Sequence, residues 1–394
     1  MRPYSLRRTV VILPLAAMLA AALSGCWDSK EIEEQFILTA VSIDTSDIPG
    51  KIRVTAQVAD IKQGEFGSGE AGQSAADSVI VMAATGDTLM GSLSQIDRNS
   101  SHKLLFHHNQ IRLFGIDLAR QGIDKHLDMI LRDQKARLEV PLAVVDGRAE
   151  EILTAKFSEM PISGVLLGSL FQDRAGISVE YRVRLIDYLN RRLDDAAAPV
   201  IPIVKAEGDE GEQEIRVVGM AVFDGGAMIG RLSIDETLGY VFTFGNVKRC
   251  NMEVIDISDR AGLHISTLSC KRKIALRKDG GIQVTLKINA DADLGEVYGF
   301  KNMKPPELLK RLEVLAQEEI KAKIERTFSA AKALDSDIFG FCTMVYKKYP
   351  KEWAEMKDRW DEIFEDIDLK VEVRVNIPET GQIVPSLEME KNMQ

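Results

Sequence analysis

A short stretch near the start of the chain, residues 23–28 with the sequence LSGCWD, determines where the mature chain is expected to begin. Arg2, Arg7 and Arg8 come first, followed by an apolar run over residues 10–23. This run is too short to remain comfortably as a membrane-spanning helix, which needs roughly 20 apolar residues. Basic residues, a short apolar run and small residues at its end are the layout of a secretory signal peptide.

The end of this segment distinguishes it from an ordinary signal peptide. A leucine and two small residues lead directly to Cys26, the pattern that is cut just before a cysteine whose sulfur carries diacylglycerol. We therefore predict that residues 1–25 are removed and that Cys26 becomes a lipid anchor, with an N-acyl group such as palmitate and an S-diacylglycerol. Several acyl chains hold a protein firmly, because each buried methylene contributes roughly 0.8 kcal/mol. The alternative is an uncleaved anchor helix in which Cys26 is incidental.

The composition of the remaining chain is that of a folded, acidic protein. Processing would leave 369 of the 394 residues, enough for two or three domains. Apolar residues make up 45% and charged residues 28% of the sequence, which indicates a globular protein. Loss of the three arginines takes the net charge from -10 to -13. Such a charge argues against nucleic acid as a partner and against electrostatic adhesion to anionic lipid, so the lipid must hold the protein at the membrane.

The cysteines do not form a recognisable framework. Besides Cys26 there are Cys250, Cys270 and Cys342, an odd number at irregular spacing that matches neither a disulfide scaffold nor a zinc site. A bridge between Cys250 and Cys270 is one possibility in an exported protein. The other is that these cysteines are small buried hydrophobic residues.

The apolar pattern predicts alternating strands and helices in the first part of the chain. Strands are expected over residues 36–44, 52–58, 78–82, 110–115 and 139–145, and helices from residue 87 and over residues 122–135, 149–157 and 178–193. On the helix 122–135, Ile123, Leu127, Ile130 and Leu131 share the apolar face. The acidic stretch 207–212 is the best candidate for a domain border.

The second part of the chain predicts hairpins, then helices, then a closing strand. One hairpin spans residues 215–232, and a second turns at residues 279–281, after which apolar and polar residues alternate from Ile282 to Ala290. A long amphipathic helix is expected over residues 305–333, another from Pro350, and a last strand over residues 371–377.

These elements predict an α+β (mixed α/β) protein of several domains. The predicted division is a removed signal peptide over residues 1–25, a mixed α/β domain over 26–148, a helical middle region over 149–206 and an α+β domain over 215–394. In this last domain an antiparallel sheet carries helices on one face.

No motif for catalysis, a cofactor or a metal stands out. Residues 67–72 match a dinucleotide fingerprint in form, but a strand follows them where the fingerprint requires a helix. His102, His107 and His108 crowd together without the spacing of a metal site, and we expect a polar loop edge there. A nucleophile elbow and a phosphate-binding loop are both missing. We therefore predict no catalytic, cofactor-binding or metal-binding residues.

A set of residues spread along almost the whole chain resembles one family of proteins. They are Cys26, Trp27, Asp28, Glu31, Ile32, Ile43 and Asp44, residues 86–89, His108, residues 118–122, 219–223, 230–232 and 337–341, and Tyr349, Pro350, Trp353 and Trp360. Their order and spacing resemble the Ger(x)C family, the lipoprotein C subunits of spore germinant receptors.

This resemblance implies a non-catalytic protein of several α/β domains, tethered through Cys26 to the outer face of the spore's inner membrane. It also implies that the partners are the A and B subunits of a germinant receptor, with which the protein responds to nutrients. The resemblance assigns nutrient binding mainly to the B subunit and leaves open whether this chain binds a nutrient.

Two other classes of protein share an exported, anchored chain. A solute-binding lipoprotein of a transporter would have two parallel-sheet lobes with a cleft between them. The antiparallel pattern over residues 215–292 argues against this architecture. An exported hydrolase is the third possibility, and no motif supports it.

Overall fold

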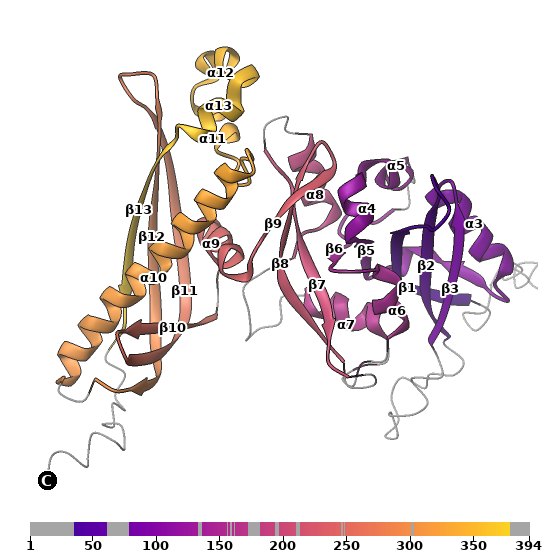
Figure 1. Ribbon diagram of the computed structural model, residues 1–394, viewed down its shortest axis with the longest axis horizontal. Coiled ribbons are helices and arrows are strands. Elements are labelled where there is room, and N and C mark those ends of the chain that lie inside the picture. Colours follow the sequence, from indigo (N-terminus) through magenta and orange to yellow (C-terminus); the bar gives the residue numbers. More distant parts are fainter. Residues whose placement is uncertain are drawn as a thin grey trace, which may run out of the picture.

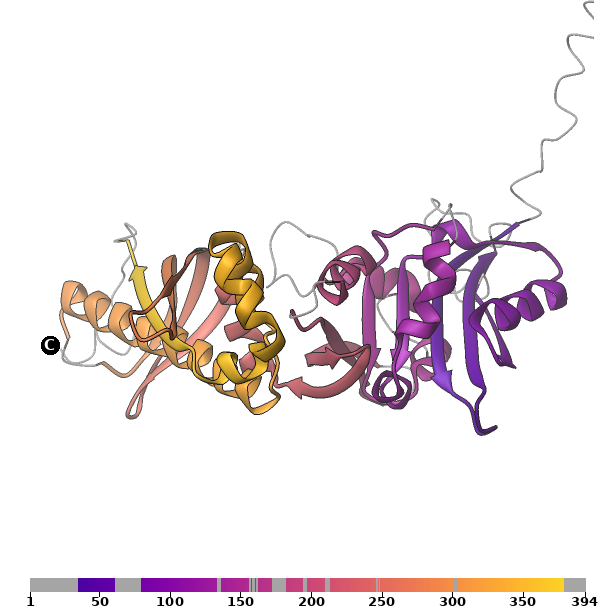
Figure 2. The same ribbon diagram turned by 90° about the horizontal axis from the view of Figure 1, so that it is seen from above.

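Two β-sheets with their helices lie side by side in an elongated molecule (Figure 1). The computed structural model describes residues 35–60, 79–132, 136–155, 157, 160, 162–171, 182–193, 197–209, 213–245, 247, 249–300 and 303–378. The view from above shows the two sheets following each other along the long axis (Figure 2). The predicted fold class, a mixed α/β protein of several parts, is confirmed.

The N-terminal sheet contains the first nine strands. They are β1 (Gln35–Thr45), β2 (Ile52–Asp60), β3 (Val79–Gly86), β4 (Lys103–Leu105), β5 (Ile111–Gly115), β6 (Leu142–Val145), β7 (Val200–Glu207), β8 (Glu214–Asp224) and β9 (Ala227–Leu232). Their order is β3-β2-β1-β5-β6-β7-β8-β9, with β4 beside β1. The central pairings from β1 to β7 are parallel, whereas the strands at both edges pair antiparallel.

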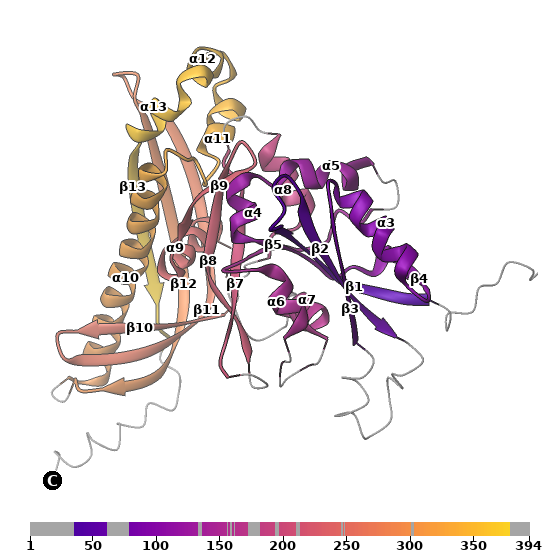
Figure 3. The same cartoon turned by 45° about the vertical axis from the view of Figure 1, so that its right-hand side comes forward.

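Helices cover both faces of the N-terminal sheet, as its parallel centre requires (Figure 3). They are α3 (Leu89–Asn99), the 3-10 helix η2 (Phe106–His108), α4 (Ile116–Gln121), α5 (Asp124–Arg132), α6 (Ala149–Thr154), α7 (Ser163–Leu170) and α8 (Leu185–Arg192). One core lies between the sheet and the helices α3, α4, α5 and α8. A smaller core lies on the opposite face, against α6 and α7.

The C-terminal sheet contains β10 (Cys250–Asp256), β11 (Asp259–Leu276), β12 (Ile282–Tyr298) and β13 (Asp368–Asn376), in that order. The first three strands pair antiparallel, and β13 pairs parallel with β12. The long helix α10 (Pro305–Ala333) crosses one face of the sheet (Figure 1). The remaining helices are α9 (Ile234–Phe244), α11 (Phe341–Lys348), α12 (Pro350–Met356), η3 (Lys357–Arg359) and α13 (Trp360–Glu365).

The predicted apolar faces of β12 and α10 are confirmed. Every second residue of β12 from Ile282 to Ala290 is buried. The stripe of α10 is buried in the same core, at Leu308, Leu312, Leu315, Ile320, Ile324 and Phe328. The alternating pattern therefore identified the strand β12, and the apolar stripe identified the face of α10 that packs against it.

The hairpin of residues 215–232 lies in a different sheet from the one we expected. It forms β8 and β9 and pairs with β7 in the N-terminal sheet. The reason lies in β8, where Met220, Ala221, Val222 and Phe223 are all buried, as in a strand covered on both faces. The acidic stretch 207–212 thus connects two paired strands, and the chain changes sheet only after Leu232. The domain borders themselves stay a prediction.

Several predicted helices are shorter than their patterns suggested. The helix from Pro350 is divided into α12, η3 and α13. The helix expected over residues 178–193 begins only at Leu185, because Arg184 is extended and forms a β-bridge with Pro141. Residues 172–181 are not among the described residues. Leu131, placed on the buried face of α5, is 50% exposed, since Ile123, Leu127 and Ile130 already fill the contact with the sheet. The short helices α7 and α11 were not predicted.

Candidate functional site

Cys26, the predicted lipid anchor, lies outside the described residues, as do the signal peptide and the glycine-rich stretch 67–72. Its lipidation therefore stays a prediction. In the part of the chain that is described, no helix is long and apolar enough to cross a membrane.

The three histidines before β5 do not converge. The ring of His102 packs on Phe36 with centroids 4.5 Å apart, and its Nδ1 lies 2.9 Å from the hydroxyl of Ser101. His107 and His108 are exposed on η2. Within the described ranges, no group of three or more side chains is placed to hold a metal ion.

Asp44, one of the family-like residues, caps the helix α6 from the end of β1. Its two carboxylate oxygens accept hydrogen bonds from the backbone N–H groups of Ala149 at 2.7 Å and Glu150 at 3.0 Å. The side chain is buried against Gly115, where a Cβ atom would meet the Asp44 oxygen at 2.2 Å. Burial raises the pKa of Asp44 to about 6, although both backbone hydrogen bonds act in the opposite direction. This carboxylate is structural, because backbone groups occupy both of its oxygens.

Gln57 joins four segments on the same side of the N-terminal sheet. Its Oε1 accepts hydrogen bonds from the Thr39 hydroxyl at 3.1 Å and the Gly164 N–H at 2.8 Å. Its Nε2 donates to the Leu153 carbonyl at 3.1 Å and the Ser163 hydroxyl at 2.8 Å. The amide is thus fully hydrogen-bonded in the interior, where it ties α6 and α7 to β1 and β2.

The family-like residues 337–341 form the joint between the two sheets. The carbonyl of Asp337 accepts a hydrogen bond from the Ala198 N–H at 3.1 Å, just before β7. The next two carbonyls accept from arginines: Arg191 of α8 reaches Ile338 at 2.6 Å, and Arg272 of β11 reaches Phe339 at 2.5 Å. One short loop therefore binds an element of each sheet through its main chain.

Aromatic rings surround these two arginines. The guanidinium of Arg272 lies 4.9 Å from the ring centroid of Phe244 and 5.3 Å from that of Phe341. Arg191 lies 5.5 Å from Phe244. A cavity of about 460 Å³ opens beside Arg191, lined by residues of α8, β7, β8 and α9. Cation–π contacts of this kind stabilise a joint whose charges are partly removed from water.

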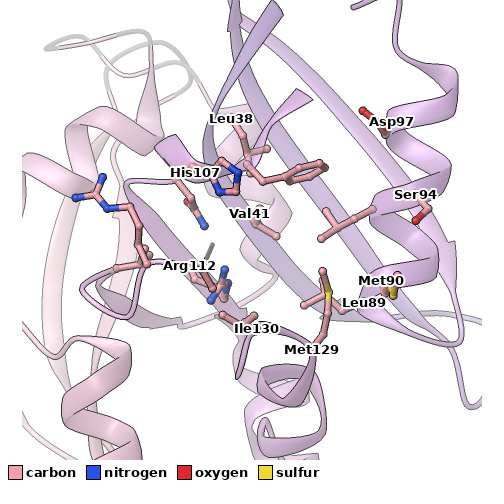
Figure 4. Close-up of a pocket in the computed structure, with 16 residues that line it drawn as sticks. Leu38, Val41, Leu89, Met90, Ser94, Asp97, His107, Arg112, Met129 and Ile130 are labelled. Carbon is pink, nitrogen blue, oxygen red and sulfur yellow. The ribbon is translucent and has the colours of Figure 1, made fainter. Parts of the chain in front are cut away.

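A second cavity, of about 230 Å³, lies between β1, β5, α3 and α5 (Figure 4). We call it the Arg112 pocket. Its walls are mostly apolar and include Leu38, Val41, Leu89 and Ile130, and Arg112 of β5 reaches into it. Burial lowers the pKa of Arg112 to about 10, so the side chain remains charged near neutral pH. Sequence reasoning missed this pocket, because its residues come from four separate segments.

The cysteines show neither a bridge nor a reactive thiol. Cys250, Cys270 and Cys342 are all unbonded to one another, so the possible bridge between Cys250 and Cys270 is absent. Burial raises the pKa of Cys250 and of Cys270 to about 11, which keeps both thiols protonated near neutral pH.

Comparison with known families gives two matches that follow each other along the chain. Residues 28–206 match the model of a spore germination protein N-terminal domain. Residues 218–381 match the model described as spore germination B3/GerAC like, C-terminal. Together the two matches extend over most of the chain.

Curated proteins match over almost their full length. Spore germination protein KC of Bacillus subtilis strain 168 is 25% identical over 95% of this chain and 96% of its own. Spore germination protein GerQC of Bacillus cereus is 20% identical over 93% of this chain and 98% of its own. Among solved structures, the crystal structure of the GerBC protein has a TM-score of 0.55 at 18% identity, covering 86% of this chain and 96% of that one. This last likeness supports the fold.

Proposed function

The chain belongs to the Ger(x)C family of spore germination proteins, and from this premise we propose that it is the lipid-anchored C subunit of a nutrient germinant receptor. The observation that carries the proposal is the order of features along one chain. A lipoprotein signal ending at Cys26 leads directly into the two germination-protein segments, residues 28–206 and 218–381.

The proposed role is assembly and signal transmission, without catalysis. Two features support a role as a structural subunit. The buried polar side chains Asp44 and Gln57 are occupied by hydrogen bonds to helices of the same chain. The two sheets are fastened by main-chain contacts of residues 337–339, which suits a body that transmits force between partners.

The proposed partners are the A and B subunits of the receptor, at the outer face of the spore's inner membrane. Relatives named spore germination protein B3 and spore germination protein A3 of Bacillus subtilis strain 168 support a place in a germination complex. The net charge of -13 after removal of residues 1–25 gives the folded body no electrostatic attraction to anionic lipid. The lipid on Cys26 would therefore supply the attachment.

The substitution Cys26→Ala tests the anchor, with Cys270→Ala as the matched control. We expect the Cys26 variant to fold normally, to leave the membrane fraction of spores and to germinate on nutrient mixtures as poorly as a deletion strain. The Cys270 variant should behave as the parent, because that thiol lies in the folded body. A Cys26 variant that stays in the membrane fraction would refute the anchor. A deletion strain that germinates normally, with no paralogue to compensate, would refute the role in germination.

The alternative function, a solute-binding lipoprotein of a transporter, has less support. Such a protein would need two parallel-sheet lobes around a cleft. In the C-terminal sheet the strands β10, β11 and β12 pair antiparallel. Crosslinking in spore membranes followed by mass spectrometry separates the two functions, because a transporter and a receptor would yield different partners.

A further inference from the structure

The Arg112 pocket contains a partly buried positive charge that no described residue neutralises. The Nε and Nη1 atoms of Arg112 are buried and have no hydrogen-bond partner. Among the residues that the structure describes, none forms an ion pair with this side chain. A buried charge without a partner is costly, and natural proteins normally pair such a group.

A second unsatisfied donor lies in the same pocket. The side-chain oxygen of Asn109 accepts a hydrogen bond from the Ile111 N–H at 3.2 Å, while its buried Nδ2 has no partner. Asn109 and Arg112 are three residues apart on the segment that enters β5, and both line the pocket. Two unpaired donors that line one cavity are groups that an anion with two oxygen atoms would satisfy.

The acidic side chain in the wall does not serve this purpose. Asp97 of α3 lies across the pocket from Arg112 and His107 (Figure 4). One oxygen of Asp97 accepts a hydrogen bond from the Leu104 N–H at 3.2 Å. The exposed side chain of Arg137 also lines the pocket and adds a second positive charge.

The rest of the pocket is suited to an apolar body. Leucine, valine, isoleucine, methionine and phenylalanine side chains from β1, α3, η2 and α5 form its walls. The volume of about 230 Å³ exceeds that of an engineered cavity of roughly 150 Å³ that binds benzene. Met90, 63% exposed, marks a side that is open to solvent.

We propose that the Arg112 pocket binds a small monocarboxylate with an apolar body, whose carboxylate pairs with Arg112 and Asn109 while its hydrocarbon part lies against Leu38, Val41 and Ile130. One carboxylate balances the single buried charge. A dianionic phosphate would leave a net negative charge in the apolar cavity, which is unfavourable. None of the residues that line the site belongs to the lipoprotein signal over residues 1–26.

Calorimetric titration of the purified full chain with hexanoate tests the proposal, with hexan-1-ol and acetate as comparison probes. We expect hexanoate to bind at least ten times more tightly than hexan-1-ol, which lacks the charge. Acetate should bind far more weakly than hexanoate, because each buried methylene is worth about a fourfold gain in affinity. Equal affinity for hexanoate and hexan-1-ol, or no measurable binding of hexanoate, would overturn the proposal.

Two variants place the binding in the pocket. Arg112→Met removes the charge but keeps much of the volume, so we expect hexanoate affinity to fall at least tenfold while hexan-1-ol affinity is unchanged. Arg120→Met is the matched control, because Arg120 of α4 forms an exposed ion pair with Asp117 outside the pocket. Its affinity for hexanoate should equal that of the parent. Hexanoate binding that is unchanged in Arg112→Met would overturn the assignment to this pocket. If that variant fails to fold, the comparison of hexanoate, hexan-1-ol and acetate on the parent protein still tests whether a carboxylate is bound.

Discussion

The two sheets of this molecule differ in the contacts that stabilise each of them. In the C-terminal sheet, every buried side chain of β10–β13 is apolar apart from the thiol of Cys250. In the N-terminal sheet, β1 and β2 alone bury Thr39, Ser42, Asp44, Thr55 and Gln57. The first sheet therefore adds the hydrogen bonds of Thr39, Asp44 and Gln57 to its apolar packing, whereas the second depends on apolar packing against α10.

This difference explains which contacts tolerate change. An apolar contact can be replaced by another of similar volume, because hydrophobic packing has little directional requirement. A buried hydrogen-bonded group such as Gln57 has partners with fixed directions, and its loss leaves several of them unsatisfied. Substitutions that change one kind of contact in each region test this contrast between apolar packing and buried hydrogen bonds.

The largest effect is expected from Ile320→Ala in α10. Ile320 is fully buried between α10 and the C-terminal sheet, so truncation leaves a cavity and should lower the free energy of unfolding by about 4 kcal/mol. Val314→Ala, on the exposed side of the same helix at 42% exposure, should cost less than about 0.5 kcal/mol. Urea unfolding measures both changes. Similar losses in the two variants would contradict the apolar account of this sheet.

A pH-dependent effect is expected at Asp44 in the other region. Its pKa is raised from 3.8 to about 6 in the folded protein, so the folded state binds a proton that the unfolded state releases between these values. The contribution of Asp44 to stability therefore falls by about 3 kcal/mol as the pH rises from 3 to 8, a range that extends beyond both pKa values. Asp44→Asn cannot titrate, and the stability difference between parent and variant should shift by that amount over this range. A difference that is constant with pH would show that the pKa of Asp44 is the same in the folded and unfolded states.

A smaller loss is expected when the Gln57 amide is replaced by an apolar side chain of similar size. Gln57→Leu leaves the Gly164 N–H and the Ser163 hydroxyl without their amide partner, although the Thr39 hydroxyl keeps its hydrogen bond to the Gln57 main-chain carbonyl, and should cost about 2 kcal/mol. Gln283→Leu, whose amide bonds Asp368 at 2.7 Å on the solvent side of β12, is the matched control and should be nearly neutral. Hydrogen exchange should show the loss at α7. Equal stability of the two variants would contradict the claim that the buried hydrogen bonds of Gln57 stabilise the N-terminal sheet.

The smallest effect concerns the joint between the regions. Arg191→Met removes the donor to the carbonyls of Ala198 and Ile338 but keeps the packing on Phe244, so we expect a loss of about 1 kcal/mol. Arg260→Met, at an exposed ion pair with Glu253, is the control. Limited proteolysis should cut the Arg191 variant faster between the two sheets. An unchanged cleavage pattern would indicate that the aromatic contacts alone hold the joint.

The sequence predicted the apolar elements well and the polar connections hardly at all. The alternation of β12 and the stripe of α10 are local patterns, so each could be recognised without knowledge of its partner. The position of the hairpin β8–β9 depends on the free edge of β7, which no pattern within the hairpin reveals. The contacts of Asp44 and Gln57 with α6 and α7 were equally hidden, because those partners lie 96 or more residues away.

The same reasoning applies to the Arg112 pocket. Arg112 occupies one position in a five-residue strand, and a single arginine there is usually expected to face solvent. Its burial follows from the approach of α3 and α5 over β1 and β5, which is a property of the whole N-terminal sheet. The predicted lipid anchor is the opposite case, since residues 23–28 carry that signal without any tertiary structure.

The parallel pairing of β13 with β12 has a consequence for the newly made protein. On the ribosome, β12 is completed some 70 residues before β13 arrives to cover its edge, and α10 is made within that interval. Throughout that interval the 17-residue strand β12 exposes unpaired main-chain groups, which are a template for another chain to add to. Aggregation during synthesis should therefore concentrate on β12, and a chaperone that shields this strand would protect the whole molecule.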